Sequence, residues 1–336
     1  MKKLSVLLFL MLGNLCSFAQ NDVSIDYSLE GLARACAKYQ KVSSFHDGLA
    51  VVLKNKVMKG LIEGHVDEEG YGRMEDYNKY GVINKQGDEI VPCIYDYIGN
   101  FHEGLANVRK EDKWGYINKK GELVIPCKYQ DANEFSEGLA TIKTNDKYGC
   151  IDSIGNIIIP CKYKDMGNFG NGVLFANTDG WRGYINKKGE KVMTPSERNY
   201  NFLEQSFSDG LSMVYNSWYY GFINMKGELT IPTIYDDARN FSEGLAVVRQ
   251  SEKWGYIDTQ GKVIIPLKYA DADSFSDGTA AVEVSGRKWI FIDKNGNQIL
   301  PNIYHEARSF SEGLAAVMQD YKWGYVDMNG KSTFDF

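Results

Sequence analysis

Apolar and polar positions alternate along this chain in short runs, and glycine-containing turns separate the runs. Residues 241–269, FSEGLAVVRQSEKWGYIDTQGKVIIPLKY, show one complete unit. A polar turn ends at Gly244, and three apolar runs follow it, with WGYI in the second and VII in the third. Asp258 and Gly261 suit a hairpin loop between the last two runs. Pro266 should end a strand or lie at a sheet edge, because it has no N–H. The unit therefore predicts a three-stranded antiparallel meander.

The unit returns about every 34 residues. The phenylalanines that open its copies are Phe45, Phe101, Phe135, Phe169, Phe207, Phe241, Phe275 and Phe310. One meander cannot bury its apolar face alone, but stacked copies bury a continuous core. We therefore expect eight repeats after an N-terminal segment, residues 20–44, that caps the array or completes its last repeat. The repeats span 45–100, 101–134, 135–168, 169–206, 207–240, 241–274, 275–309 and 310–336, the first with an insertion near 54–79 and the last truncated.

The sequence KWGYINKKGELVIPCKY at 113–129 resembles the WG-repeat family of bacterial tandem repeats. The resemblance recurs along residues 45–336, and it implies a β-repeat scaffold, of a kind often exported, with no general catalytic activity. Two repeats depart from the family pattern. Arg182 takes the Trp position in one, and Ile290 replaces the Gly after Trp289 in the other.

An array of such repeats can be open or closed. A unit of this size with three strands is short for a propeller blade, which has four strands and about 40 residues. The fold we expect is therefore all-β, an open twisted solenoid. A closed, propeller-like ring is the alternative, because Tyr39 stands as far before Phe45 as Tyr129 stands before Phe135. The N-terminal segment could then complete the last repeat.

The N-terminus has the features of an export signal. Two lysines precede an apolar run, and the residues SFA at 17–19 offer a cleavage site. Residues 1–19 therefore predict a signal peptide and an exported protein, in the periplasm, at the cell surface or secreted. We expect no lipid anchor at Cys16, since Leu15 stands where such a motif needs a small residue. No other stretch predicts a membrane span, and the net charge of −6 argues against nucleic acid as the partner.

The aromatic residues fall into two groups. Those at regular positions should build the core of the repeats: Trp114, Trp254, Trp289, Trp323, Phe135, Phe241 and Phe310. Trp181 and Tyr219 instead stand in the slot that lysines such as Lys113 occupy, and Trp218 precedes Tyr219. Successive side chains of a strand point to opposite faces, so these three residues are predicted to form an exposed patch that binds a sugar ring or a protein. Local repacking of the core is the alternative.

Motifs for catalysis or metal binding do not appear in the sequence. The four histidines have no metal-ligand spacing, and the acids of the FSEGLA hexapeptide recur with every turn, as structural residues do. We expect no enzyme activity, no cofactor and no metal site. Cys150 and Cys161 flank one hairpin turn, and an exported protein could join them in a disulfide.

The function that the sequence predicts is binding without catalysis. We expect a repeat scaffold of the cell envelope that binds a protein or an envelope glycan. The rival classes are a glycan-active enzyme, which would need acids outside the repeated turn, and a purely structural spacer. The acid- and glycine-rich insertion near 54–79 is a second place where a ligand could bind.

Overall fold

The computed structural model describes residues 29–56, 77–193, 201–202 and 206–335. This part of the chain is almost entirely β, with one α-helix, α1 (Leu29–Cys36), and one short 3-10 helix, η1 (Thr333–Asp335). The predicted signal peptide and most of the first-repeat insertion, residues 57–76, lie outside the described residues. No helix among the described residues is long and apolar enough to cross a membrane.

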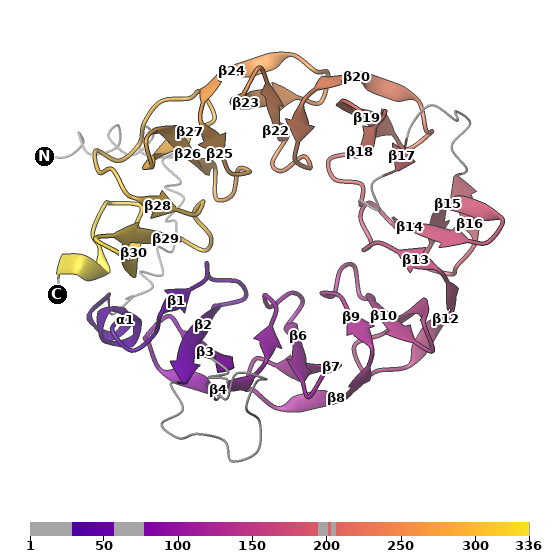
Figure 1. The fold of residues 1–336 in the computed structure, drawn as a ribbon, viewed down its shortest axis with the longest axis horizontal. Coiled ribbons are helices and arrows are strands. Elements are labelled where there is room, and N and C mark those ends of the chain that lie inside the picture. The colour runs from indigo at the N-terminus through magenta and orange to yellow at the C-terminus, as the bar shows by residue number, and fades with distance from the viewer. Residues whose placement is uncertain (1–28, 57–76, 194–200, 203–205, 336) are drawn as a thin grey trace, which may run out of the picture.

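The strands form eight small antiparallel sheets in a closed ring (Figure 1). The expectation of an open solenoid of three-stranded meanders is therefore wrong, and the propeller-like ring is the architecture of this chain. We call each sheet a blade and number the blades along the chain. In the described chain six blades have four strands and two have three. Each blade includes a strand of only two residues that precedes the hexapeptide, too short to be recognised in the sequence.

The strands follow one order in every blade, and the last strand of each four-stranded blade lies toward the outside of the ring (Figure 1). Blades 1 to 4 contain β1 (Lys41–Val42), β2 (Leu49–Lys56), β3 (Tyr77–Asn84), β4 (Glu89–Tyr95); β5 (Tyr97–Ile98), β6 (Leu105–Lys110), β7 (Lys113–Asn118), β8 (Leu123–Tyr129); β9 (Asp131–Ala132), β10 (Ala140–Thr144), β11 (Lys147–Ile151), β12 (Ile157–Tyr163); and β13 (Asp165–Met166), β14 (Val173–Thr178), β15 (Trp181–Asn186), β16 (Lys191–Met193). Blades 5 to 8 contain β17 (Asn201–Phe202), β18 (Leu211–Tyr215), β19 (Tyr220–Asn224), β20 (Leu229–Tyr235); β21 (Asp237–Ala238), β22 (Leu245–Gln250), β23 (Lys253–Asp258), β24 (Val263–Tyr269); β25 (Asp271–Ala272), β26 (Thr279–Ser285), β27 (Lys288–Asp293); and β28 (Glu306–Ala307), β29 (Leu314–Gln319), β30 (Lys322–Asp327).

The glycine of the Trp-Gly pair makes room for the outer strand. In blade 6, Trp254 pairs with Tyr269, and the register of β23 against β24 shifts next to Gly255. A Cβ on Gly255 would lie 2.7 Å from the carbonyl oxygen of Ile265, so any larger residue would push the outer strand away. Pro266 lies exposed in the middle of this strand. An edge strand tolerates proline there, because the missing N–H is not needed for pairing.

Blade 7 has no glycine at this position. Ile290 takes its place and is buried, 9% exposed. The outer segment of blade 7 is joined to the sheet by two isolated bridges, Trp289 with Tyr304 and Ile292 with Gln298, so blade 7 has three strands.

The hydrophobic cores lie between neighbouring blades. Tyr256 and Ile265 of blade 6, for example, pack in one cluster with Phe275 and Val282 of blade 7. Of the aromatic residues expected in the core, Trp254, Phe135, Phe241 and Phe310 are buried, and Trp114, Trp289 and Trp323 are partly buried against such clusters.

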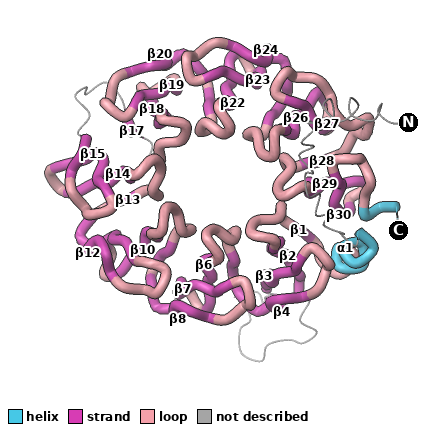
Figure 2. The backbone as a smooth tube through the Cα atoms, turned by 180° about the vertical axis from the view of Figure 1, so that it is seen from behind, coloured by secondary structure: helices cyan, strands magenta, loops and turns pink. Residues whose placement is uncertain are grey.

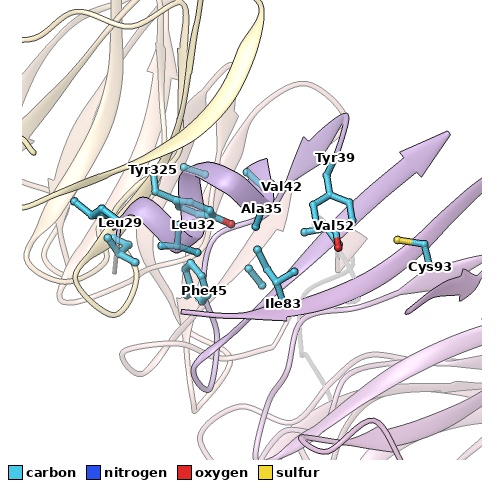
Figure 3. Close-up of a cluster of buried hydrophobic side chains, with 13 residues drawn as sticks. Leu29, Leu32, Ala35, Tyr39, Val42, Phe45, Val52, Ile83, Cys93 and Tyr325 are labelled. Carbon is cyan, nitrogen blue, oxygen red and sulfur yellow. The ribbon is translucent and has the colours of Figure 1, made fainter. Parts of the chain in front are cut away.

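The seam between blades 8 and 1 closes the ring with a helix. In blade 8, η1 follows β30 where the six four-stranded blades have an outer strand, and α1 lies beside both. Leu29, Leu32 and Ala35 of α1 pack with Phe45 of blade 1 and Tyr325 of blade 8 in one buried cluster (Figure 3). The two ends of the described chain therefore meet in this cluster.

Candidate functional site

Loops from all blades line the inner rim of the ring (Figure 2). Glu243 and Gly244 of blade 6 have positive φ values, 54° and 84°, which gives a two-residue hairpin between Ser242 and Leu245. In each hexapeptide, the side chain at the Glu243 position accepts the backbone N–H of the glycine in the next one, at 2.7–3.1 Å. We call this set of bonds the inner belt. Its acceptor–donor pairs are Asp47–Gly104, Glu103–Gly138, Glu137–Gly172, Asn171–Gly210, Asp209–Gly244, Glu243–Gly278, Asp277–Gly313 and Glu312–Gly48.

The inner belt shows why the hexapeptide acids recur. Three of its glutamates also pair with a lysine of the next blade in the ring. These pairs are Glu312–Lys85 at 2.9 Å, Glu137–Lys187 at 3.1 Å and Glu243–Lys294 at 3.2 Å. The acids of the hexapeptide therefore join blades to one another.

Two histidines and a glutamate meet at the inner rim of blades 1 to 3. His46 and His102 replace the usual serine, and their ring centroids lie 5.6 Å apart. His102 Nε2 lies 3.2 Å from a carboxylate oxygen of Glu134, and this hydrogen bond raises the pKa of His102. Burial, and then the neighbouring His102, lower the pKa of His46. Sequence reasoning missed this cluster, although Glu134 stands just before the hexapeptide, where Asn100 is found one repeat earlier.

The turn between β18 and β19 in blade 5 exposes two of the three predicted ligand-binding residues. Asn216 Oδ1 accepts the backbone N–H groups of Trp218 at 3.3 Å and Tyr219 at 2.9 Å, and Asn216 Nδ2 donates to Thr233 Oγ1 at 2.7 Å. Ser217 has a φ of 81°, which is uncommon for a residue other than glycine. The fixed turn leaves Trp218 78% exposed and Tyr219 44% exposed.

Two further tyrosines support this turn. The rings of Tyr215 and Tyr220 lie 4.9 Å apart, one on each strand, and they face each other across the hairpin. Tyr215 Oη donates to the carbonyl oxygen of Ser217 at 2.6 Å. We call residues 215–220 the aromatic turn. The side chains of Asn216 and Tyr215 thus fix the backbone of its tip, Asn216 at Trp218 and Tyr219 and Tyr215 at Ser217.

The third predicted residue, Trp181, lies in other surroundings. It is half-buried and packs against the cluster between blades 3 and 4, and the Lys191 ammonium lies 4.4 Å from the centroid of its ring. Trp218 belongs to blade 5 instead. Trp181 therefore serves the junction between blades 3 and 4, while Trp218 and Tyr219 form the exposed group.

The described cysteines are free thiols. Cys150 belongs to the cluster between blades 3 and 4, whereas Cys161 packs against the cluster between blades 2 and 3. The two sulfurs lie on opposite faces of one sheet, so the predicted disulfide is not formed. Burial raises the pKa of Cys150 to about 12. No group of three or more His, Cys, Asp or Glu side chains in the described ranges is arranged to hold a metal ion.

Comparison with known proteins gives the family. The profile described as WG containing repeat matches residues 37–57, 80–114, 114–148, 148–180, 220–254, 254–289 and 291–323, which is more than half of the chain. The chain belongs to the WG-repeat family. No match is found among the curated proteins by sequence.

Solved structures resemble this WG-repeat protein at low sequence identity. A eukaryotic initiation factor is 10% identical, with 87% of this chain and 86% of that chain covered and a TM-score of 0.53. The extracellular domain of a putative one component system from B. thetaiotaomicron is 11% identical, with 87% and 53% covered and a TM-score of 0.42. BamB from Moraxella catarrhalis is 10% identical, with 68% and 78% covered and a TM-score of 0.38. The first of these likenesses concerns the fold alone, and the other two are too distant to carry an argument.

Proposed function

We propose that this WG-repeat protein is an exported, non-catalytic scaffold that binds a protein partner through the aromatic turn. Membership of a repeat family and the propeller-like ring support a scaffold. The sequence of residues 1–19 supports export. The carboxylates of the hexapeptide, which recur in the chain, are bonded to the next blade, and this supports a role without catalysis.

The observation that carries the proposal is the exposure of Trp218 on a fixed turn. Exposing an indole to water is unfavourable, and a positive φ at Ser217 adds backbone strain. Asn216 nevertheless holds this conformation with two hydrogen bonds. Strained and exposed features of this kind gather at binding sites, and Trp is enriched among the residues that dominate the affinity of protein interfaces.

A protein partner fits this geometry better than a glycan does. Trp218 stands at the tip of a hairpin, and it is far more exposed than its neighbour Tyr219. A projecting side chain can enter a pocket of a partner, whereas a sugar ring is held best where several surfaces converge around it. An envelope glycan is therefore the alternative outcome of the test.

The matched control for Trp218 is Ile154 in blade 3. Ile154 is 77% exposed, and its backbone N–H is also held by a side chain, Asp152 Oδ1 at 3.1 Å. Three proteins are compared: the parent, Trp218→Ala and Ile154→Ala. Each is cross-linked to its neighbours in the envelope fraction of the source cell. The partner that is found is then purified, and its binding to each protein is measured by titration. The same three proteins are applied to a glycan array.

Trp218→Ala should weaken binding of the purified partner about tenfold or more, and Ile154→Ala should leave it unchanged. Equal binding by both variants would overturn the role of the aromatic turn. If the parent and Ile154→Ala bind a glycan and Trp218→Ala does not, the partner of the aromatic turn is a glycan and not a protein. Turnover of a glycan by the parent would overturn the non-catalytic assignment.

A further inference from the structure

Tyr321 of blade 8 stands at an unusual place in a turn. In blades 2, 3, 6 and 8 the turn between the second and third strands has two residues with positive φ. The second of them is Asp112, Asp146 or Glu252 in the first three of these blades, and in blade 8 it is Tyr321, with a φ of 62°. Positive φ is uncommon for a bulky residue and stores backbone strain, which gathers at ligand sites. The side chain of Tyr321 is also 89% exposed.

The ring of Tyr321 is held in place by a neighbouring ring. It stacks with the imidazole of His305, with the ring centroids 6.2 Å apart and an angle of 20° between the planes. The backbone N–H of His305 in turn donates to the carbonyl oxygen of Met318 at 2.9 Å. The exposed ring therefore has a fixed orientation, which reduces the entropy lost when a ligand packs on it.

A groove of about 870 Å³ lies beside this ring, between α1, η1 and the start of β30. The aromatic side chains in its lining include Tyr321, Trp323 and Phe334, and the charged ones are Glu30, Arg34 and Lys322. Glu30 and Arg34 form an ion pair at 2.5 Å on the exposed side of α1. The groove therefore combines aromatic rings with a carboxylate acceptor and two cationic donors.

We propose that this groove binds a short oligosaccharide. A sugar ring has an apolar C–H face, which packs on the face of an aromatic ring because that face carries negative charge density. Its hydroxyl groups both donate and accept hydrogen bonds, so they match the carboxylate of Glu30 as well as the N–H groups of Arg34 and Lys322. Three parts of the chain converge around the groove, and a small ligand is buried best where surfaces converge.

Other classes of ligand fit this lining less well. An apolar ligand would take Glu30, Arg34 and Lys322 out of water without giving them hydrogen bonds, which is unfavourable. A phosphate or a nucleotide would bring negative charge beside the carboxylate of Glu30, and like charges repel. An uncharged ligand that is rich in hydroxyl groups meets neither cost.

The groove is independent of the aromatic turn, since one lies in blade 8 and the other in blade 5. The two proposals can therefore fail separately. Trp218→Ala should bind the oligosaccharide as tightly as the parent does.

The probes are neutral hexasaccharides of glucose, of mannose and of N-acetylglucosamine, each titrated against the full chain by isothermal titration calorimetry. Tyr321→Gly removes the ring, and it also relieves the backbone strain, so folding is not at risk. Tyr321→Phe keeps the ring. Glu252→Gly is the matched control, because Glu252 holds the same position in the turn of blade 6 with a φ of 64°. Arg34→Ala removes one donor.

We expect the parent to bind at least one of the hexasaccharides saturably. Tyr321→Gly should bind it about tenfold more weakly, because the stacking surface is lost. Arg34→Ala should lose about threefold, the effect of one hydrogen-bonding group that solvent partly replaces. Tyr321→Phe and Glu252→Gly should bind as the parent does.

Four results would overturn the proposal. The first is that the parent binds none of the three hexasaccharides. The second is unchanged binding by Tyr321→Gly, and the third is an equal loss in Glu252→Gly, which would make the effect one of turn geometry. The fourth is a loss in Trp218→Ala without a loss in Tyr321→Gly, which would assign the sugar to the aromatic turn.

Discussion

The junction between blades 6 and 7 and the seam between blades 8 and 1 differ only in their outer half. On the inner side, Glu243 bonds Gly278 and Lys294 at the first junction, as Glu312 bonds Gly48 and Lys85 at the seam. The tyrosines match too, since Tyr256 Oη donates to Asp273 O at 2.8 Å and Tyr325 Oη to Ser43 O at 2.7 Å.

On the outer side the two junctions share little. Blade 6 has the full outer strand β24, whereas blade 8 has η1 and packs against α1. The comparison shows that the inner rim has the same bonds at the seam as at a regular junction. Only the outer rim differs, where η1 and α1 replace the outer strand.

The largest effect is expected from weakening α1. Leu32 is fully buried in the seam cluster, so Leu32→Ala should lower the free energy of unfolding by about 2–5 kcal/mol. Chemical denaturation measures this loss, and limited proteolysis should show cleavage near the seam first. Arg34→Ala, on the exposed side of the same helix, is the control and should change stability by less than about 1 kcal/mol. Equal effects of both variants would show that α1 does not hold the seam.

The second largest effect on stability should come from replacing the glycine beside the outer edge of a blade, and it should differ between blade 6 and blade 8. A Cβ on Gly255 would meet backbone atoms of Ile265 and Leu267, whereas a Cβ on Gly324 would meet the side chains of Thr333 and Phe334. Side chains can rotate away more easily than a paired strand can move. Gly255→Ala should therefore cost about 2–3 kcal/mol and Gly324→Ala about 1 kcal/mol, measured by thermal and urea unfolding. A reversed order would contradict the structural difference between the two outer edges.

The third effect should be the same at both junctions. Glu243→Ala and Glu312→Ala each remove an acceptor of the next glycine N–H and a lysine partner. Both side chains are 32% exposed, so solvent screens the charge, and we expect a loss of about 1 kcal/mol for each. Urea unfolding at low and high salt measures both. A much larger loss for Glu312→Ala would show that the seam depends on its inner bonds more than a regular junction does.

The smallest effect concerns pH at the inner rim of blades 1 to 3, where His46, His102 and Glu134 lie. The pKa of His102 is raised above 6.5, so the stabilisation from its bond with Glu134 is full below pH 6.5 and disappears as pH rises through the folded value. The pKa of His46 is lowered, so its contribution is full above pH 6.5 and is lost as pH falls through the folded value. NMR titration of the two imidazoles should show His102 titrating above His46. His102→Ser should remove the first dependence, and an unchanged pH profile in that variant would contradict it.

Much of each blade was predictable because its causes are local. The turn at Glu243 and Gly244, the hairpin at Asp258 and Gly261 and the run of apolar residues before Pro266 specify strands by their own backbone preferences. The exposure of Trp218 was also predictable, since it follows from where the repeat pattern is broken. The partial burial of Trp181 was not, because it depends on Lys191 and on the neighbouring blade.

The sequence by itself determined the repeat, its turns and the three longer strands of the regular repeat, but not the two-residue strand that begins each blade. It also placed Gly255 where a Cβ would lie 2.7 Å from the carbonyl oxygen of Ile265 in the outer strand. Tertiary structure alone decided that the array closes. Closure requires the small rotations between successive blades to add up to one full turn, so that Glu312 reaches Gly48 at 2.9 Å. That sum depends on how all the blades pack together, and no single repeat encodes it.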